Sequence, residues 1–204
     1  MRLPFEPAAL ALATGLLFGI AAEAPAQAVQ LAPFAGYGFG GSLRSSADEQ
    51  TYSVKSAFAY GGTADFRIAT GWRFEILYSR QETKLEGTGL TPGLDLTVER
   101  YMAGFQEEKG EGPSHWFGTL LLGATRFVPA LPGSSGTTRF SAGVGLGVKG
   151  FFSKNVGIRL EGRAFFTSVT SDAGLVCVDG QCLFRFSGSG LWQGDVSAGL
   201  ILAF

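Results

Sequence analysis

The chain has 204 residues, 16 Lys and Arg, 17 Asp and Glu, one His and a formal net charge of −1 at pH 7. This balance provides no basic surface of the kind that nucleic-acid binding requires, so that class of function is not expected. The chain also contains 31 glycines and 18 phenylalanines. Glycine and aromatic residues in such numbers suit barrel strands, in which small lumen-side positions oppose bulky outer ones, better than helices.

The first residues predict an export signal. Arg2 precedes an apolar run over residues 8–22, and Ala26-Gln27-Ala28 gives the small-x-small pattern of a signal-peptidase site. The alternative is a membrane helix, but about fifteen apolar residues are short of the roughly 20 that a bilayer needs. We expect a signal peptide at 1–28, export through the periplasm, and one mature domain at 29–204.

Alternation of apolar with polar or glycine residues recurs eight times in the mature chain. The fourth and fifth segments are less cleanly phased, and the sequence leaves their facing open. The pattern predicts an all-β, eight-stranded antiparallel up-and-down transmembrane β-barrel. The expected strands cover 29–42, 54–68, 73–83, 94–106, 115–128, 138–152, 156–168 and a last strand from near Leu183 or Leu191.

A soluble barrel would alternate in the same way, with its apolar face inside. The lengths of the connections favour the membrane alternative, because outer-membrane barrels keep short turns on the periplasmic side. The second, fourth and sixth connections (69–72, 107–114, 153–155) are mostly short. The other four (43–53, 84–93, 129–137, 169–190) are mostly longer and rich in Gly, Ser, Thr, Asp and Pro.

Aromatic residues mark the same end of the predicted barrel. Trp72, Trp116 and Phe152 lie at or beside the three short turns, and Phe204 is the last residue. Amphipathic rings concentrate at membrane interfaces. We therefore expect these four residues to form an aromatic girdle at the periplasmic interface.

The last strand alternates apolar residues up to a terminal phenylalanine. Its apolar series is Val196, Ala198, Leu200, Leu202 and Phe204. Together with segments 32–41 (APFAGYGFGG), 123–127 (GATRF) and 196–200 (VSAGL), this strand resembles small bacterial outer-membrane β-barrel proteins of the OmpA/OmpX-like type. The resemblance implies that the barrel-assembly machinery reads the Phe204 strand as an assembly signal. It covers the mature chain and implies architecture, with no shared activity.

Charged residues are expected on the lumen side of several strands. A polar conduit or an ion-binding site is one interpretation. We favour a core of paired charges that plugs the lumen, because eight strands enclose an interior that side chains can fill and an unpaired charge there is costly. The expected lumen residues are Lys55, Asp65, Arg67, Arg73, Glu75, Arg139, Lys149, Arg159, Glu161, Arg163 and Asp195.

Two cysteines, Cys177 and Cys182, enclose the four residues 178–181. Asp179-Gly180 is a strong two-residue turn signal, which would make the two cysteines opposed residues of a hairpin. Passage through an oxidising compartment then favours a disulfide in the fourth long loop, over free thiols or a metal site.

Signals for catalysis are sparse. His115 is the single histidine, beside Trp116 at the expected periplasmic rim, where an interfacial role is favoured over a ligand or a base. Residues 145–150 match G-x-G-x-x-G but lie inside a strand, without the helix that a dinucleotide site needs. We expect no catalytic residue, cofactor or metal, and we expect the strand glycines to make room in a narrow lumen.

The sequence thus predicts a non-enzymatic integral protein of the Gram-negative cell outer membrane. Its role would be structural or a surface interaction, such as adhesion or envelope stabilisation, carried by the extracellular loops. The alternatives are a narrow, porin-like channel for small solutes and, third, a lipid-modifying barrel enzyme. Expected partners are outer-membrane lipid, the barrel-assembly machinery and an extracellular or host ligand, and we expect a monomer.

Overall fold

The computed structural model describes residues 28–45, 51–87, 90–110, 112–131, 134–169, 174–178, 181–187 and 190–204. These residues form β-strands and their connections, and none of them belongs to a helix long and apolar enough to cross a membrane. The expected signal peptide lies outside the described residues, apart from Ala28, and stays a prediction.

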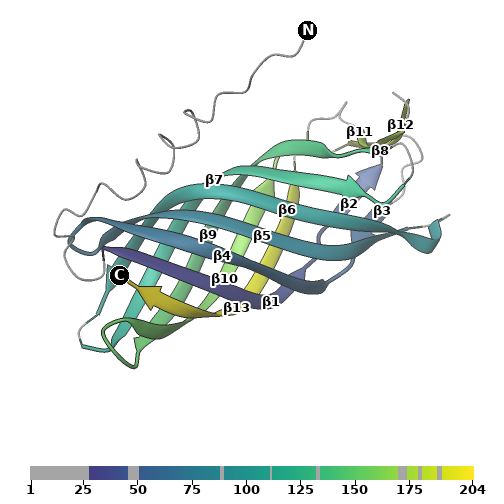
Figure 1. Ribbon diagram of the computed structural model, residues 1–204. Helices are drawn as coiled ribbons and strands as arrows, with labels where there is room; N and C mark the ends of the chain where they lie inside the picture. The colour runs from purple at the N-terminus through teal and green to yellow at the C-terminus, as the bar shows by residue number, and fades with distance from the viewer. Residues whose placement is uncertain are drawn as a thin grey trace, which may run out of the picture.

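Eight long strands of the described chain close into a barrel (Figure 1). Each pairs antiparallel with its neighbours, and β1 pairs with β13 to complete the circle. The predicted eight-stranded antiparallel barrel is therefore confirmed. The strands are β1 (Val29–Phe39), β4 (Ala57–Ala69), β5 (Trp72–Gly87), β6 (Leu90–Lys109), β7 (Ser114–Pro129), β9 (Thr137–Phe151), β10 (Val156–Thr167) and β13 (Leu191–Ala203).

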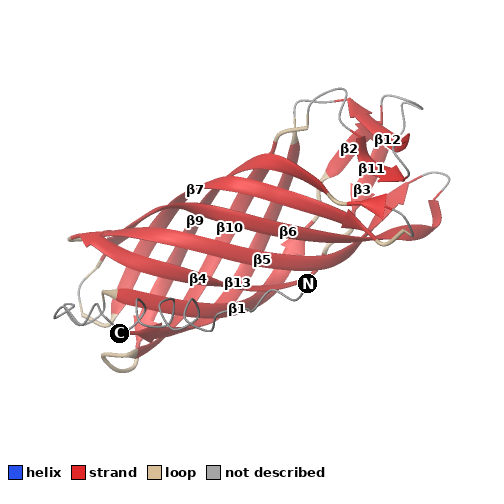
Figure 2. Cartoon of the chain, turned by 45° about the horizontal axis from the view of Figure 1, so that its top comes forward, coloured by secondary structure: helices blue, strands red, loops and turns tan. Residues whose placement is uncertain are grey.

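Five short strands continue the wall beyond one end of the barrel, opposite the end that holds the C-terminus (Figure 2). β2 pairs with β3 and β12, β11 pairs with β12 and β8, and β3 pairs with the outer end of β5. The extra strands thus lengthen the barrel wall on the side of the long connections. They are β2 (Ser42–Ser45), β3 (Thr51–Val54), β8 (Ser134–Ser135), β11 (Gly174–Val178) and β12 (Gln181–Ser187).

The second long connection differs from its prediction. Residues 84–93 were expected to form a loop, but β5 and β6 remain paired through most of it, with Lys84 facing Asp95 and Gly87 facing Leu90. Charged residues alternate with apolar ones here, so the ladder continues past the apolar part of the wall. The short turns lie at the opposite end, where Gly71 takes a left-handed conformation with φ of 73° between β4 and β5.

The burial pattern is the reverse of a soluble barrel's. Inside the barrel, Arg73 is 2% exposed and Glu75 is 0% exposed. On the outside, Leu146 is 76% exposed and Trp116 is 72% exposed. Water does not favour that arrangement, whereas lipid around the wall does.

Two apolar layers share the lumen with its polar side chains. A middle layer consists of Phe34, Leu77, Met102, Leu121 and Phe165. A second cluster joins the outer ends of the strands to the short strands and consists of Tyr52, Val54, Leu85, Leu96, Val98, Phe127, Val169 and Leu191. The lumen is therefore polar toward the short turns and apolar in its middle layer. It is polar again beyond that layer, where Ser79, Gln81 and Arg100 are buried, and apolar at its outer mouth.

Candidate functional site

The charge network is the most distinctive feature of the lumen. We define it as five cations and five carboxylates that are buried, or nearly so in the case of Glu108, so that their formal charges cancel. The members are Arg73, Arg100, Lys149, Arg159, Arg163, Asp65, Glu75, Glu108, Glu161 and Asp195.

Arg159 of β10 is the centre of the network. Its Nη1 lies 3.0 Å from Oδ2 of Asp65, and its Nη2 lies 2.7 Å from Oε2 of Glu75. Its Nε donates to Oε2 of Glu161 at 2.8 Å. The guanidinium carbon also lies 4.4 Å from the centre of the Phe117 ring. One arginine therefore meets three carboxylates and an aromatic face, which offsets the cost of burying its charge.

Glu161 extends the network toward the middle of the barrel. Its Oε2 also accepts from Nη2 of Arg163 at 2.5 Å, and its Oε1 accepts from the hydroxyl of Thr119 at 3.3 Å. Arg163 lies over the Phe34 ring at 4.8 Å and 3.7 Å from Oδ1 of Asp195. The arginine thereby connects the polar part of the lumen to the apolar middle layer.

Lys149 lies at the end of the network nearest the short turns. Its Nζ donates to Oε1 of Gln30 at 2.8 Å and to Oδ2 of Asp65 at 3.1 Å, and it lies 2.5 Å from Oε1 of Glu108. The same Glu108 oxygen accepts from Nε of Arg73 at 3.0 Å. With Gln30 on β1 and Thr119 on β7, the network and its hydrogen-bond partners draw on all eight barrel strands.

The strand register places like charges side by side. Asp65 faces Glu75 across β4 and β5, and Lys149 faces Arg159 across β9 and β10. In this hairpin the charges of opposite sign, such as Asp65 and Arg73, are diagonal neighbours. The ion pairs of Asp65 and Glu75 reach Lys149 and Arg159 across the lumen. Charges of opposite sign on the facing strands neutralise each like-charge pair, and these ion pairs connect opposite sides of the barrel.

Three charges expected in the lumen, Arg67, Lys55 and Arg139, lie outside the network. Arg67 follows the inward alternation, but it is exposed near the β4–β5 turn. Lys55 is exposed between β3 and β4 and lies 2.9 Å from Oε1 of Glu86 on the outer side of the wall. The Glu86 carboxylate raises the pKa of Lys55. Arg139 is half-buried on β9.

Sequence reasoning missed Arg100 and Glu108, both on β6. Arg100 is 1% exposed, donates from Nη2 to Oε1 of Gln193 at 3.1 Å, and lies over the Phe165 ring at 4.7 Å. The facing of this strand could not be assigned from its alternation. Long-range pairing with β5 and β7 fixes it instead.

Gly145 makes room for the network. A Cβ at this position would lie 2.6 Å from Oε1 of Glu161 and within contact distance of the Thr119 hydroxyl. Any side chain would therefore displace the carboxylate that binds Arg159 and Arg163. The G-x-G-x-x-G match at 145–150 lies within β9, where Gly145 serves close packing.

The four residues of the expected girdle are exposed at the end of the barrel that carries the short turns. Trp72 begins β5, Trp116 lies near the start of β7, Phe152 follows β9 and Phe204 follows β13. The backbone N–H of Phe204 donates to the carbonyl of Val29 at 2.9 Å, which helps join the first strand to the last. The expected assembly residues Val196, Ala198, Leu200, Leu202 and Phe204 all face outward.

Cys177 and Cys182 are opposed residues of the β11–β12 ladder. Residues 179–180, where the turn was expected, lie outside the described residues. The side chains of these strands lie outside the described part as well, so the disulfide stays a prediction.

His115 is half-buried near the start of β7, with its ring 5.9 Å from the ring of Phe151. A hollow of about 260 Å³ beside it has Lys149 as its one charged lining residue among those described. The described residues also contain no cluster of three His, Cys, Asp or Glu that could hold a metal ion.

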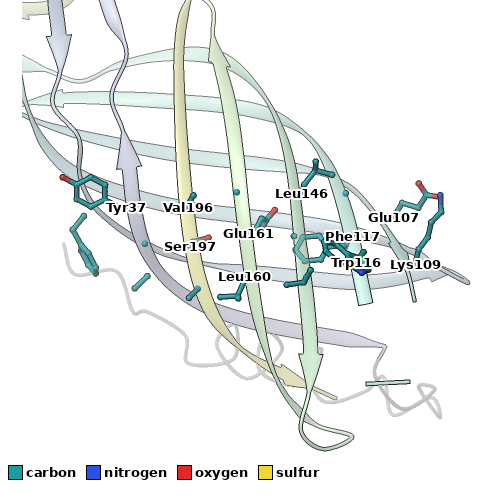
Figure 3. Close-up of a pocket in the computed structure, with 18 residues that line it drawn as sticks. Tyr37, Glu107, Lys109, Trp116, Phe117, Leu146, Leu160, Glu161, Val196 and Ser197 are labelled. Carbon is teal, nitrogen blue, oxygen red and sulfur yellow. The ribbon is translucent and has the colours of Figure 1, made fainter. Parts of the chain in front are cut away.

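A larger hollow, of about 1120 Å³, has lining residues on β1, β4, β6, β7, β9, β10 and β13 (Figure 3). Many of its lining residues are exposed apolar side chains, such as Tyr37, Leu146 and Val196. This surface is continuous with the apolar exterior, so the hollow does not indicate a polar ligand site.

No protein-family model and no curated protein matches the sequence. Solved structures do match. Neisserial surface protein A is 20% identical, with a TM-score of 0.63, over 88% of this chain and 99% of that one. The outer membrane protein OprG from Pseudomonas aeruginosa is 13% identical, with a TM-score of 0.58, over 86% and 95% of the two chains.

The outer membrane protein AlkL, solved in lipid bilayers, is 10% identical, with a TM-score of 0.56, over 87% of this chain and 90% of that one. The chain has the fold of small outer-membrane β-barrels. Identities this low establish the fold alone, and the resemblance in the sequence is confirmed at that level.

Proposed function

We propose that this chain is an integral protein of the bacterial outer membrane whose lumen is closed by the charge network. The reversed burial pattern supports the membrane placement, because apolar side chains cover the outside while charges fill the inside. The similar solved structures support the same compartment.

One observation supports the closed lumen most strongly: the network and its hydrogen-bond partners Gln30 and Thr119 draw on all eight strands and cross the barrel. Arg159 alone reaches carboxylates on β4, β5 and β10. The apolar middle layer lies next along the axis, and the Arg163 guanidinium stacks on its Phe34 ring. An ion would have to pass both, which opposes conduction.

With a closed lumen, the specific role falls on the parts of the wall that project from the outer leaflet. The short strands β2, β3, β8, β11 and β12 extend the barrel there and offer a surface for adhesion or envelope contacts. We propose a monomer that requires outer-membrane lipid and the barrel-assembly machinery, with a structural or surface-interaction role and no enzymatic activity.

A narrow channel is the second candidate. The observation in its favour is that both carboxylate oxygens of Asp195 and the Nε and Nη1 of Arg100 have no hydrogen-bond partner in the described residues. Polar groups of this kind suit a lumen that contains water. Conductance measurements separate the two candidates.

Refolding in detergent tests the membrane proposal. The mature chain should show β-rich circular dichroism and a heat-dependent shift in gel mobility. A helical spectrum, or a monomer that stays soluble without detergent, would contradict it.

Deletion of Phe204 tests the assembly role of the last strand. The deletion should reduce the amount of barrel in the outer membrane far more than removal of Val29 and Gln30 does. Equal effects of the two truncations would show that the terminal residue carries no assembly signal.

A further inference from the structure

The apolar belt around the barrel is uneven in height. On β13, every outward residue from Trp192 to Phe204 is uncharged, and the same holds on β10 from Val156 to Phe166. On β6, outward Glu99 and Glu107 enclose only Tyr101, Ala103 and Phe105. The two sectors of the wall therefore offer lipid different lengths of apolar surface.

Strand geometry converts these spacings into heights. Eight residues of a strand tilted by 35–45° rise about 20 Å, and twelve residues rise about 30 Å. An outer-membrane barrel presents an apolar band about 25 Å tall. The β6 sector is therefore too short for the band, and its outer charges lie at the level of lipid headgroups or slightly below.

Three of those charges form one row across adjacent strands, the outer triad Arg80–Glu99–Arg126. Arg80 of β5 faces Glu99 of β6, which in turn faces Arg126 of β7. Nη1 of Arg80 lies 3.4 Å from Oε1 of Glu99, and Nη1 of Arg126 lies 4.0 Å from Oε2 of Glu99. Two guanidinium groups thus share one carboxylate. Nη2 of Arg80 also lies 3.0 Å from Oε1 of Glu82, whereas Arg126 is held loosely and is half exposed.

Aromatic side chains lie directly below the triad. Tyr78 and Tyr101 face each other on β5 and β6 with ring centres 5.2 Å apart, and the Tyr101 hydroxyl donates to Oε2 of Glu99 at 3.3 Å. Such a pair places the interface between hydrocarbon and headgroups at the level of the triad.

A hollow of about 470 Å³ adjoins the triad on its outer side. Its charged lining residues are Lys55, Arg80, Lys84, Glu82 and Asp95. Lys55 pairs with Glu86 and is 59% exposed, and Lys84 lies 3.2 Å from Oδ1 of Asp95 and is 50% exposed. Both ammonium groups therefore remain accessible to an approaching headgroup.

We propose that the face of β5, β6 and β7 binds the phosphorylated headgroup of a lipid in the outer leaflet, with Arg80 and Arg126 as the principal phosphate ligands. Guanidinium groups bind phosphate through two parallel hydrogen bonds, and Lys84 and Lys55 add point charges around the hollow. The neighbouring Glu82 and Asp95 suit a headgroup layer that also contains divalent cations. The inference depends on the proposed membrane placement.

Native mass spectrometry of the refolded, detergent-solubilised protein tests the inference with three probes. These are lipid A with both phosphates, lipid A without phosphate but with the same acyl chains, and inorganic phosphate alone. The test variant carries Arg80→Gln and Arg126→Gln. The control is Lys109→Gln, which also removes an outward, ion-paired cation, 3.0 Å from Glu107, but near the opposite rim.

We expect the double variant to lose at least tenfold in retention of phosphorylated lipid A, while Lys109→Gln stays within twofold of the natural protein. Equal losses in both variants, or equal retention of the phosphate-free lipid by the natural protein, would overturn the inference. Binding of inorganic phosphate as strong as that of phosphorylated lipid A would also overturn it. Heat-dependent gel mobility, measured on every sample, shows separately whether the barrel itself has formed.

Discussion

Ion pairs on the inner and outer faces of the same wall behave differently because their surroundings differ. Inside, Glu161 accepts hydrogen bonds from Arg159 and Arg163 and its side chain is fully buried. Outside, Glu82 lies 3.0 Å from Arg80, and its side chain is 63% exposed. The two pairings have similar distances, so distance alone does not predict what each contributes.

Burial makes the inner charges depend on one another. Removing one partner of a buried pair leaves the other charge without compensation, whereas a solvated pair loses little. The inner network should therefore determine stability, and the outer charges should determine what the surface contacts.

The largest expected effect comes from breaking the inner network. Glu161→Ala leaves Arg159 and Arg163 underpaired, which should lower the free energy of unfolding by about 3–5 kcal/mol, or less where lumen water remains. Urea unfolding followed by heat-dependent gel mobility measures this change.

The matched control is Glu82→Ala, which removes an exposed carboxylate from the outer face. A surface pair contributes about 0–1 kcal/mol, so this variant should unfold close to the natural protein. Equal destabilisation by the two substitutions would contradict the distinction between the inner and outer pairs.

A smaller effect is expected from crowding the network without removing a charge. Gly145→Val adds a side chain where Glu161 already lies, and overpacking of this kind costs about 1–3 kcal/mol. Gly162→Val is the control, because a Cβ there has its nearest neighbour 3.9 Å away. The comparison uses the same unfolding measurement, and a greater loss from Gly162→Val would show that Gly145 does not accommodate the network.

The smallest effect on barrel stability is expected from the cysteines, which lie in the short strands beyond the barrel. Replacing Cys177 and Cys182 with serine should make this segment more sensitive to protease while the unfolding midpoint of the barrel stays nearly unchanged, because the closed loop is short. Thiols that react with an alkylating agent before any reduction would show that no disulfide forms.

Much of the fold could be predicted from the sequence because a membrane-spanning strand alternates apolar outward residues with polar or small inward ones along its whole length. In β10, Ile158 and Leu160 face outward while Arg159 and Glu161 face the lumen, as expected. β6 was ambiguous because its apolar residues change from one face to the other along the strand. Above the belt, apolar Val98 is inward and Glu99 is outward. Within the belt, apolar Phe105 is outward and Gln106 is inward. Above the belt the wall resembles a soluble barrel.

The same inversion limits prediction of the site. Arg159, Glu161, Lys149 and Asp65 could be assigned to the lumen from alternation, but Arg100 and Glu108 could not. Nor does alternation reveal that Asp65 faces Glu75, because that depends on the register between β4 and β5. Position along the barrel axis explains the remaining difference, since Arg67 is exposed near the turn despite its inward parity.

Single-channel recording in planar bilayers tests the central claim, that the charge network closes the lumen, most directly. Refolded natural protein should insert, as its heat-dependent gel mobility and protease resistance in the same lipid would show, yet give no steady conductance. Glu161→Ala should also conduct little, because the other side chains still fill the bore. A steady open current from the natural protein, with ion selectivity that changes in Glu161→Ala, would contradict the account.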